Sequence, residues 1–347
     1  MSETVVFRNV DIVFGEKPER ALAMIDAGKS RDEIGKETGL VVGVAGASLT
    51  INEGEILVLM GLSGSGKSTL LRAVNGLAPV VRGEVQVKTS GTALNPYDCS
   101  PKALRAFRMH TVSMVFQQFA LLPWRTVADN VGFGLELAGM PDAERKARVE
   151  EQLHLVNLTQ WANRKVNELS GGMQQRVGLA RAFATGAPIL LMDEPFSALD
   201  PLIRTRLQDE LLEFQRRLKK TIIFVSHDLD EAFRIGNRIA IMEGGRIIQC
   251  GTPADIVKSP ANQYVADFVQ NMNPINMLTA GDVMLPGLSG PAVGVTATAR
   301  PETPLVDILD AMARQPGSIG VVENGAIVGM INAQNVVESL TRHRRRE

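Results

Sequence analysis

The stretch EILVLMGLSGSGKSTLLRAVNG, residues 55–76, constrains the fold of this chain more than any other. A short apolar run leads into a glycine-rich turn and then into a helix-like segment that opens with lysine and two hydroxyl residues. This context predicts an α/β fold in which a buried strand and a helix flank a P-loop, whose backbone amides face phosphate groups. The residues that we expect to hold phosphates are Gly61, Ser63, Gly64, Ser65, Gly66, Lys67, Ser68 and Thr69. Lys67 would reach the outer phosphates, and the Ser68 hydroxyl would ligate Mg²⁺.

A second apolar run, APILLMDEP at residues 187–195, ends in two adjacent carboxylates. At the end of a buried parallel strand, alternation would point the two side chains in opposite directions. We expect Asp193 to face the magnesium shell and Glu194 to act as the general base that polarises a water molecule at the γ-phosphate. The sequence thus predicts nucleotide hydrolysis.

The octapeptide LSGGMQQR at residues 169–176 has the features of another anion-binding helix start. Ser170 is in an N-cap position, and Gly171 and Gly172 would let a phosphate approach the backbone amides. Since the P-loop is by itself a complete phosphate cradle, a second such site in one chain needs an explanation.

Composition sets the remaining limits. The 347 residues, 45% hydrophobic and 22% charged, suggest one large domain and a smaller one. A net charge of −1 gives no general attraction to nucleic acid or anionic membranes. Cys99 and Cys250 are too few for a zinc cluster or a disulfide framework. With no leader pattern and no apolar window of spanning length, we expect a chain that is neither exported nor membrane-spanning.

Five motifs together resemble those of the ATP-binding cassette (ABC) ATPases: the P-loop, LSGGMQQR, ILLMDEP, SALD at 197–200 and IIFVSHD at 222–228. The resemblance covers residues 5 to about 270. It implies a RecA-like core, an antiparallel β subdomain, a helical subdomain at about 118–176, and ATP with Mg²⁺ as cofactors. It also explains the second helix start, since in this family the signature peptide completes the ATP site of another copy. Ser170, Gly171, Gly172 and Gln174 would then contact the nucleotide of a homodimer partner.

The resemblance assigns four further residues. Gln117 matches the loop glutamine that contacts Mg²⁺ and the attacking water, and it is favoured over the adjacent Gln118. His227 matches the switch histidine at the γ-phosphate, and Asp200 would lie at the dimer seam. Phe14 is the candidate to stack on adenine, with a core phenylalanine as the alternative.

An insertion at residues 17–41 separates Phe14 from the next predicted strand. Pro18 and a Ser30–Glu33 capping box predict two short helices. Five basic and five acidic residues between 17 and 37 leave no positive stripe, which argues against DNA reading. Such an insertion is similar to that in ATPases of glycine betaine, proline betaine and choline importers.

That resemblance implies an ATP-hydrolysing subunit on the cytoplasmic face of the membrane. It would work with transmembrane permease subunits and, indirectly, with an external substrate-binding protein, which together select the solute. The exposed segment LPWR at 122–125 is a candidate docking surface for the permease, although Trp124 could instead pack under its own loop. The alternatives are an importer of another small solute such as taurine, and a non-transport ABC ATPase.

The chain after residue 272 is expected to be a linker followed by one module similar to a single CBS motif. A helix capped by Thr303, a hairpin at Asn324 and Gly325 and a helix at AQNVVESL carry the resemblance. Because such motifs normally work in pairs, pairing with a second copy of the chain could complete the module, as the symmetry of a dimer permits. The basic end, RHRRRE, would either stay solvated or touch anionic lipid.

Overall fold

The computed structural model describes residues 2–89, 91–117, 120–197, 199–270, 275, 278–286, 295–323 and 325–344. They form two compact units, Met1–Thr252 and Pro253–Glu347. The division falls before the expected position at residue 272. Helices α10 (Pro253–Lys258) and α11 (Gln263–Gln270) belong to the second unit, where Lys258 pairs with Asp282. No helix in the described ranges is both long and apolar enough to cross a bilayer.

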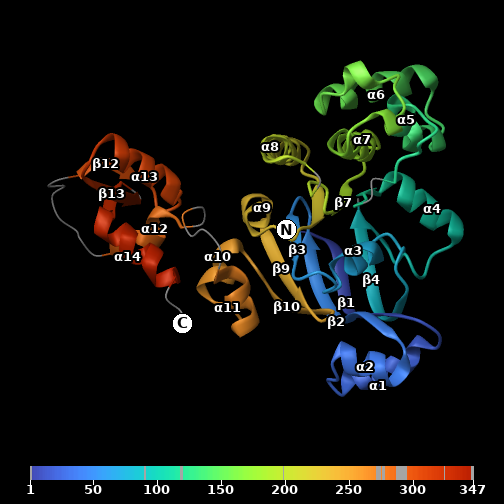
Figure 1. The fold of residues 1–347 in the computed structure, drawn as a ribbon, viewed down its shortest axis with the longest axis horizontal. Helices are drawn as coiled ribbons and strands as arrows, with labels where there is room; N and C mark the ends of the chain where they lie inside the picture. The colour runs from blue at the N-terminus through green and yellow to red at the C-terminus, as the bar shows by residue number, and fades with distance from the viewer. Residues whose placement is uncertain are drawn as a thin grey trace. The chain divides into compact units, whose positions relative to one another are not determined.

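A six-stranded sheet forms the centre of the first unit (Figure 1). Its order is β10 (Arg246–Gly251), β9 (Arg238–Glu243), β3 (Ile56–Met60), β8 (Thr221–Val225), β7 (Ile189–Asp193) and β6 (Val112–Val115). All pairs are parallel except β10 with β9. The residues of β3, β6, β7 and β8 are buried throughout, as the apolar runs predict. Parallel pairing brings the loops after β3, β7 and β8 to one edge, where the predicted motifs lie.

A second, antiparallel sheet packs on the same core. Its order is β2 (Val41–Asn52), β1 (Glu3–Phe14), β4 (Val80–Thr89) and β5 (Thr92–Leu94). Side chains of this sheet such as Phe7 and Val44 share one buried cluster with Leu59 of β3 and Leu70 of α3 (Lys67–Ala73). Helix α4 (Pro101–His110) adds Phe107 to that cluster. The packing fixes β1 and β2 beside the P-loop.

The insertion folds as predicted. It contains η1 (Pro18–Ala21), α1 (Leu22–Asp26) and α2 (Arg31–Thr38), and the capping box between Ser30 and Glu33 is formed. In Figure 1 the two α-helices lie side by side next to the ends of β1 and β2. Their apolar residues form a small core with both strands, made of Val13, Ala21, Ile25, Ile34, Leu40, Val42 and Ala45.

A helical subdomain branches from the loop after β6. It holds α5 (Val127–Leu137), α6 (Asp142–Leu155), η2 (Thr159–Trp161), η3 (Val166–Glu168) and α7 (Gly171–Ala184), around their own apolar core. Figure 1 shows α5, α6 and α7 grouped together. Helices α8 (Pro201–Leu218) and α9 (Leu229–Ile235) follow β7 and β8.

The second unit contains a four-stranded sheet in the order β11, β14, β13, β12, in which only β12 and β13 are parallel. Its elements after α11 are α12 (Ala280–Val283), β11 (Leu285–Pro286), β12 (Val295–Ala299), α13 (Leu305–Arg314), β13 (Ser318–Glu323), β14 (Ala326–Ile331) and α14 (Ala333–Arg344). The predicted cap of α13 is wrong. Pro304 is the N-cap, because the Thr303 hydroxyl instead accepts a 2.9 Å hydrogen bond from the amide of Arg300. Asn324 lies outside the described residues.

Candidate nucleotide-binding site

The P-loop connects β3 to α3 and depends on two glycines with little space around them. Gly61 and Gly66 have φ angles of +141° and +102°, which non-glycine residues rarely adopt. A Cβ atom would lie 2.1 Å from the Met242 carbonyl oxygen at the first position and 2.3 Å from the Gly43 carbonyl oxygen at the second. These positions therefore need glycine both for conformation and for close backbone approach.

Lys67 is almost fully buried at the start of α3, with 6% of its surface exposed. Its ammonium group donates hydrogen bonds to the carbonyl oxygens of Gly61, at 2.8 Å, and Leu62, at 2.9 Å. Burial lowers the pKa of Lys67, while the carboxylates of Glu194 and Asp193 act in the opposite direction. The loop thus holds a desolvated cation whose natural partner is an anion.

Ser68 and Asp193, the two residues expected at Mg²⁺, are in direct contact. The Ser68 hydroxyl donates a 2.6 Å hydrogen bond to Asp193 Oδ1, and Arg72 Nη2 lies 3.0 Å from Oδ2. Asp193 is fully buried at the end of β7. The P-loop hydroxyl and the carboxylate at the strand end are therefore adjacent, as predicted. Arg72 is an additional partner of Asp193 that the sequence does not signal.

Glu194 lies just beyond β7 and has a φ angle of +49°. Its amide donates to Val225 O at 3.2 Å, and the Ser197 hydroxyl donates to its carbonyl oxygen at 3.1 Å. Asp193 and Glu194 do diverge, but strand alternation is not the reason, because the strand ends before Glu194. A left-handed residue, held by bonds on both sides, turns the carboxylate into the cavity. Left-handed backbone at a non-glycine residue is strained and is concentrated at functional sites.

Gln117 and His227 meet at this carboxylate. Gln117 Nε2 donates a 3.0 Å hydrogen bond to Glu194 Oε2, and His227 Nδ1 lies 3.4 Å from the same oxygen. The His227 side chain is 63% exposed, so it is free to turn. Three predicted catalytic side chains from three different loops therefore converge. Gln118, the alternative to Gln117, lies outside the described residues.

These residues border a cavity of about 440 Å³. Its lining consists of Phe14, Arg31, Val41, Gly43, Ser63, Gly64, Gly66, Lys67, Ser68, Thr69, Gln117, Glu194 and His227. Gly61, Ser65 and Asp193 lie behind this surface. Ser65 is 5% exposed, and its hydroxyl finds no hydrogen-bond partner among the described residues.

The cavity has an apolar end and a polar end. Phe14 and Val41 are paired across β1 and β2, and 39% and 52% of their surfaces are exposed. The alternative that Phe14 is a core residue is therefore wrong. A planar base fits the aromatic end and phosphates fit the P-loop end, so the cavity has the polarity of a nucleotide.

The signature residues are not part of this lining. Ser170 caps α7 by accepting a hydrogen bond from the Met173 amide at 3.4 Å, and Gln174 Nε2 donates to Leu169 O at 3.1 Å. Gly171 is exposed, and Gly172 is partly so. Asp200 caps α8 through the amide of Ile203, at 3.1 Å. Both helix starts are formed, but neither lies in the lining of the cavity of its own chain.

Three lining residues were not among the sequence-based candidates: Arg31, Val41 and Gly43. A Cβ atom at Gly43 would lie 2.9 Å from both the Phe14 ring and the Thr69 side chain, so glycine keeps this end of the cavity open. Val41 could have been found as the expected strand neighbour of Phe14. Nothing in the sequence pattern brings Arg31 to the P-loop, since that contact depends on how the insertion packs.

Comparison with known proteins agrees with this geometry. The profile of the ABC transporter family matches residues 44–197. The ATP-binding protein of the glycine betaine/proline betaine transport system of Escherichia coli is 49% identical over 82% of this chain and 70% of its own length. The ATP-binding protein of the trimethylamine N-oxide transport system of Ruegeria pomeroyi is 42% identical over 98% of this chain and 97% of its own.

A solved ATP-binding cassette, a dimer in a post-hydrolysis state with ADP and phosphate, matches with a TM-score of 0.61 and 31% identity over 72% of this chain and 98% of its own. The predicted cassette fold is therefore confirmed. The P-loop, the buried carboxylate, the side chains that converge on Glu194 and the relatives all agree: the chain belongs to the ABC transporter family, as an ATP-binding subunit that hydrolyses ATP.

Proposed function

We propose that this chain drives the import of a small methylated amine, of the class of glycine betaine, proline betaine and trimethylamine N-oxide, with choline as a further member. The observation that carries the proposal is the shared solute class of relatives that align over most of the chain. The glycine betaine/proline betaine protein covers 82% of it, and the trimethylamine N-oxide protein covers 98%, including the second unit. The solute would be selected by a permease and an external binding protein, while this chain supplies the energy.

Two copies of the chain would close on ATP. Support comes from the position of Ser170 and Gly171 outside the cavity of their own chain, at the exposed start of a helix long enough to present amides to an anion. A second copy packed head to tail would bring these residues, with Gly172 and Gln174, to the γ-phosphate. Asp200, exposed at the start of α8, would lie at the seam.

Mg²⁺ would be held with the phosphates by Ser68 and Asp193, with Gln117 nearby. Hydroxyl, carboxylate and amide oxygens form the hard donor set that Mg²⁺ prefers, and the first two groups are already in contact. When bound, Mg²⁺ would neutralise phosphate charge. Glu194 would accept the proton of the attacking water, and Gln117 and His227 would orient that water and the γ-phosphate.

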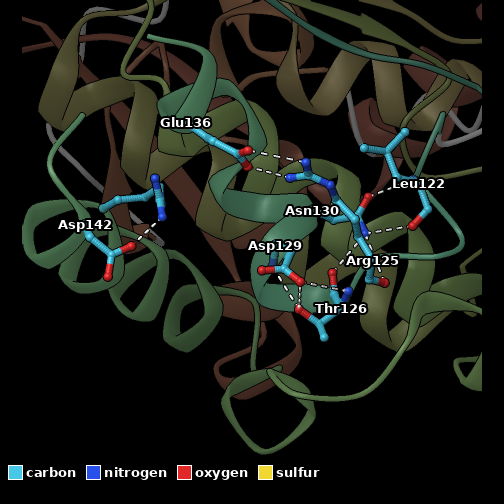
Figure 2. Close-up of polar contacts among 8 residues, drawn as sticks. Leu122, Arg125, Thr126, Asp129, Asn130, Glu136 and Asp142 are labelled. Carbon is cyan, nitrogen blue, oxygen red and sulfur yellow. Dashed lines mark hydrogen bonds and ion pairs between the residues drawn. The ribbon is translucent and has the colours of Figure 1, made fainter. Parts of the chain in front are cut away.

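The permease would dock at the loop that precedes α5. Trp124 is 70% exposed, which contradicts the alternative that it packs beneath its own loop. Figure 2 shows how the loop is held: Asn130, fully buried, accepts from the Leu122 amide at 2.8 Å and donates to the carbonyl oxygens of Leu122 and Thr126. Arg125 pairs with Glu136 on α5. A large exposed aromatic side chain on a rigid loop is typical of an interface anchor.

The second unit would be a CBS-like module that pairs with its counterpart in the other copy. The order α13, β13, β14, α14 is the one that the resemblance implies. A cavity of about 720 Å³ lies in this unit, between the segment 298–303 and the end of β13. With permease and binding protein present, the chain would be a peripheral protein at the cytoplasmic face of the membrane.

Uptake by cells tests the solute class. Cells that lack this chain but keep its permease and binding protein would receive either the intact chain or Glu194→Gln, at low and high osmolarity. We expect the intact chain alone to restore uptake of labelled glycine betaine, trimethylamine N-oxide or choline. Restoration of taurine or putrescine uptake instead would contradict the proposal. Putrescine belongs in the panel because a spermidine/putrescine import protein of Mesorhizobium japonicum is 43% identical over 77% of the chain.

A further inference from the structure

The helical insertion contacts the P-loop through the side chain of Arg31. Arg31, the first residue of α2, donates a hydrogen bond from Nη1 to the carbonyl oxygen of Gly64. The same side chain lines the nucleotide cavity together with Phe14 and Lys67. Arg31 is thus the one member of that lining that comes from residues 17–38.

The insertion holds Arg31 firmly in place. The start of α2 is fixed by the capping box, in which the Ser30 amide donates to Glu33 at 2.7 Å. Ile34, one turn further on, is buried in the small core that the insertion shares with β1 and β2. A position with a fixed helix start and a buried neighbour presents its side chain in a narrow range of directions.

A charged bridge fastens the insertion at another point. Arg82 of β4 contacts Asp11 of β1 at 2.6 Å and Asp26 of α1 at 2.7 Å. These hydrogen bonds, that to Asp26 first, raise the pKa of Arg82 above its ordinary value, so it remains charged at any working pH. The insertion is therefore tied to the antiparallel sheet by this bridge as well as by the small core that it shares with β1 and β2.

Gly64 lies at a loosely packed point of the P-loop. Its φ angle is +78°, and a Cβ atom built on it would meet no atom within 4 Å. In contrast, Gly61 and Gly66 are packed tightly against neighbouring backbone. The carbonyl of this peptide accepts from Arg31, and its amide, that of Ser65, donates to Leu62 O at 3.1 Å, so both ends of the peptide are held and the loop keeps the curvature that presents its other amides to an anion.

From this arrangement we propose that Arg31 is a positioning residue for nucleotide binding: it fixes the Gly64 peptide, and with it the phosphate-binding shape of the loop, and adds a positive charge to the cavity. The insertion would then be part of the ATP site. This inference rests on the assignment of the cavity as an ATP site. It is independent of the solute, so a failure of the uptake experiment leaves it standing.

Affinity for ADP and GDP, measured by calorimetry on the purified full chain, tests the inference without hydrolysis. Arg31→Ala is expected to weaken ADP binding about tenfold, the scale of one hydrogen bond from a charged donor. The matched control is Lys36→Ala, which removes a positive charge from an exposed position on the same helix. The control should bind ADP as the unchanged chain does.

Arg31→Lys keeps the charge but has a shorter side chain with one donor group. Its affinity for ADP should fall about two- to threefold. Because Arg31 acts on the phosphate loop, Arg31→Ala should weaken ADP and GDP binding by the same factor, with an unchanged melting temperature of the nucleotide-free chain. Equal affinities of Arg31→Ala and Lys36→Ala would overturn the proposal. So would a loss confined to ADP, which indicates a base contact, or a loss that follows a lowered melting temperature.

Discussion

Gln117 Nε2 and Glu194 Oε2 are 3.0 Å apart, although 77 positions of the chain separate the two residues. The contact joins the loop after β6, which leads into the helical subdomain, to the carboxylate after β7. A shift of one loop therefore acts directly on the position of the other. The hydrogen bond also restrains the rotamer of Glu194, so the candidate base is oriented by the loop that leads to the proposed docking segment, residues 122–125.

Glu194→Gln should lower ATP hydrolysis by about 10²- to 10⁴-fold, because an amide cannot accept the proton of the attacking water. ATP binding should survive, since Lys67 and the loop amides are untouched. The measurement is phosphate release together with nucleotide affinity. Glu213→Gln, at an exposed position on α8, is the control and should hydrolyse ATP normally. Hydrolysis within threefold of normal in Glu194→Gln would exclude Glu194 as the base.

Gly66→Ala should abolish nucleotide binding. A left-handed backbone costs a non-glycine residue about 1–2 kcal/mol, and here the new methyl group would also overlap the Gly43 carbonyl. Titration with ADP and a thermal melt measure the effect. Gly139→Ala has a similar φ angle of +75° but open space around it, so it should cost stability without affecting ADP binding. Equal ADP affinity in both variants would argue against the P-loop geometry.

Asn130→Ala should destabilise the first unit by about 1–3 kcal/mol, because the partly buried amide and carbonyl groups of Leu122 lose their side-chain partner. Urea unfolding measures the stability, and limited proteolysis reports on the loop that carries Trp124. Asn163→Ala, at an exposed position in the same subdomain, is the control. A loop that stays resistant to protease in Asn130→Ala would show that other contacts hold it.

Trp124→Ala should lower solute uptake about tenfold while the ATPase activity of the isolated chain stays the same, since the side chain lies outside the cavity lining. Trp161→Ala is the matched control, as Trp161 is the other tryptophan and is 38% exposed. Uptake in Trp124→Ala equal to that of the control would place the docking surface elsewhere.

Glu231 predicts a pH dependence of stability. Burial raises the pKa of this carboxyl above its ordinary value of 4.5, although Ser226 and Gln208 donate hydrogen bonds to it. A raised pKa means that the folded chain favours the protonated form, so the stabilising contribution is present below pH 4.5 and is lost as the pH rises through the folded-state pKa. Relative to the unchanged chain, Glu231→Gln should therefore gain melting temperature as the pH rises from 4.5 to 8. A difference that stays constant across this range would contradict the prediction.

The sequence predicts most of the residues that border the cavity because these residues belong to rigid local motifs. The local sequence determines the geometry of the strand, turn and helix around Lys67. The same holds for the strand that ends in Asp193. The meeting of Gln117, Glu194 and His227 follows once three parallel strands end at one edge of a sheet. These relationships need only short-range patterns and one rule of sheet topology.

Contacts that depend on tertiary packing could not be predicted in this way. Arg31 reaches Gly64 only because α2 packs on β1 and β2, and neither residue type signals the other. The left-handed backbone of Glu194 replaces the simple alternation that its strand suggested. At Thr303 a local competition misled the prediction, since the hydroxyl satisfies the Arg300 amide rather than the helix start.

The separation of Ser170 from the cavity of its own chain determines how defects would combine in a cell. In a pair of copies that share two sites, Lys67→Ala in one copy and a signature variant in the other both damage the same site and leave the second intact. Two defective genes expressed together would thus restore part of the transport that each alone abolishes. If one chain carries both changes and pairs with an intact chain, each of the two sites contains one of the changes. Neither site then stays intact.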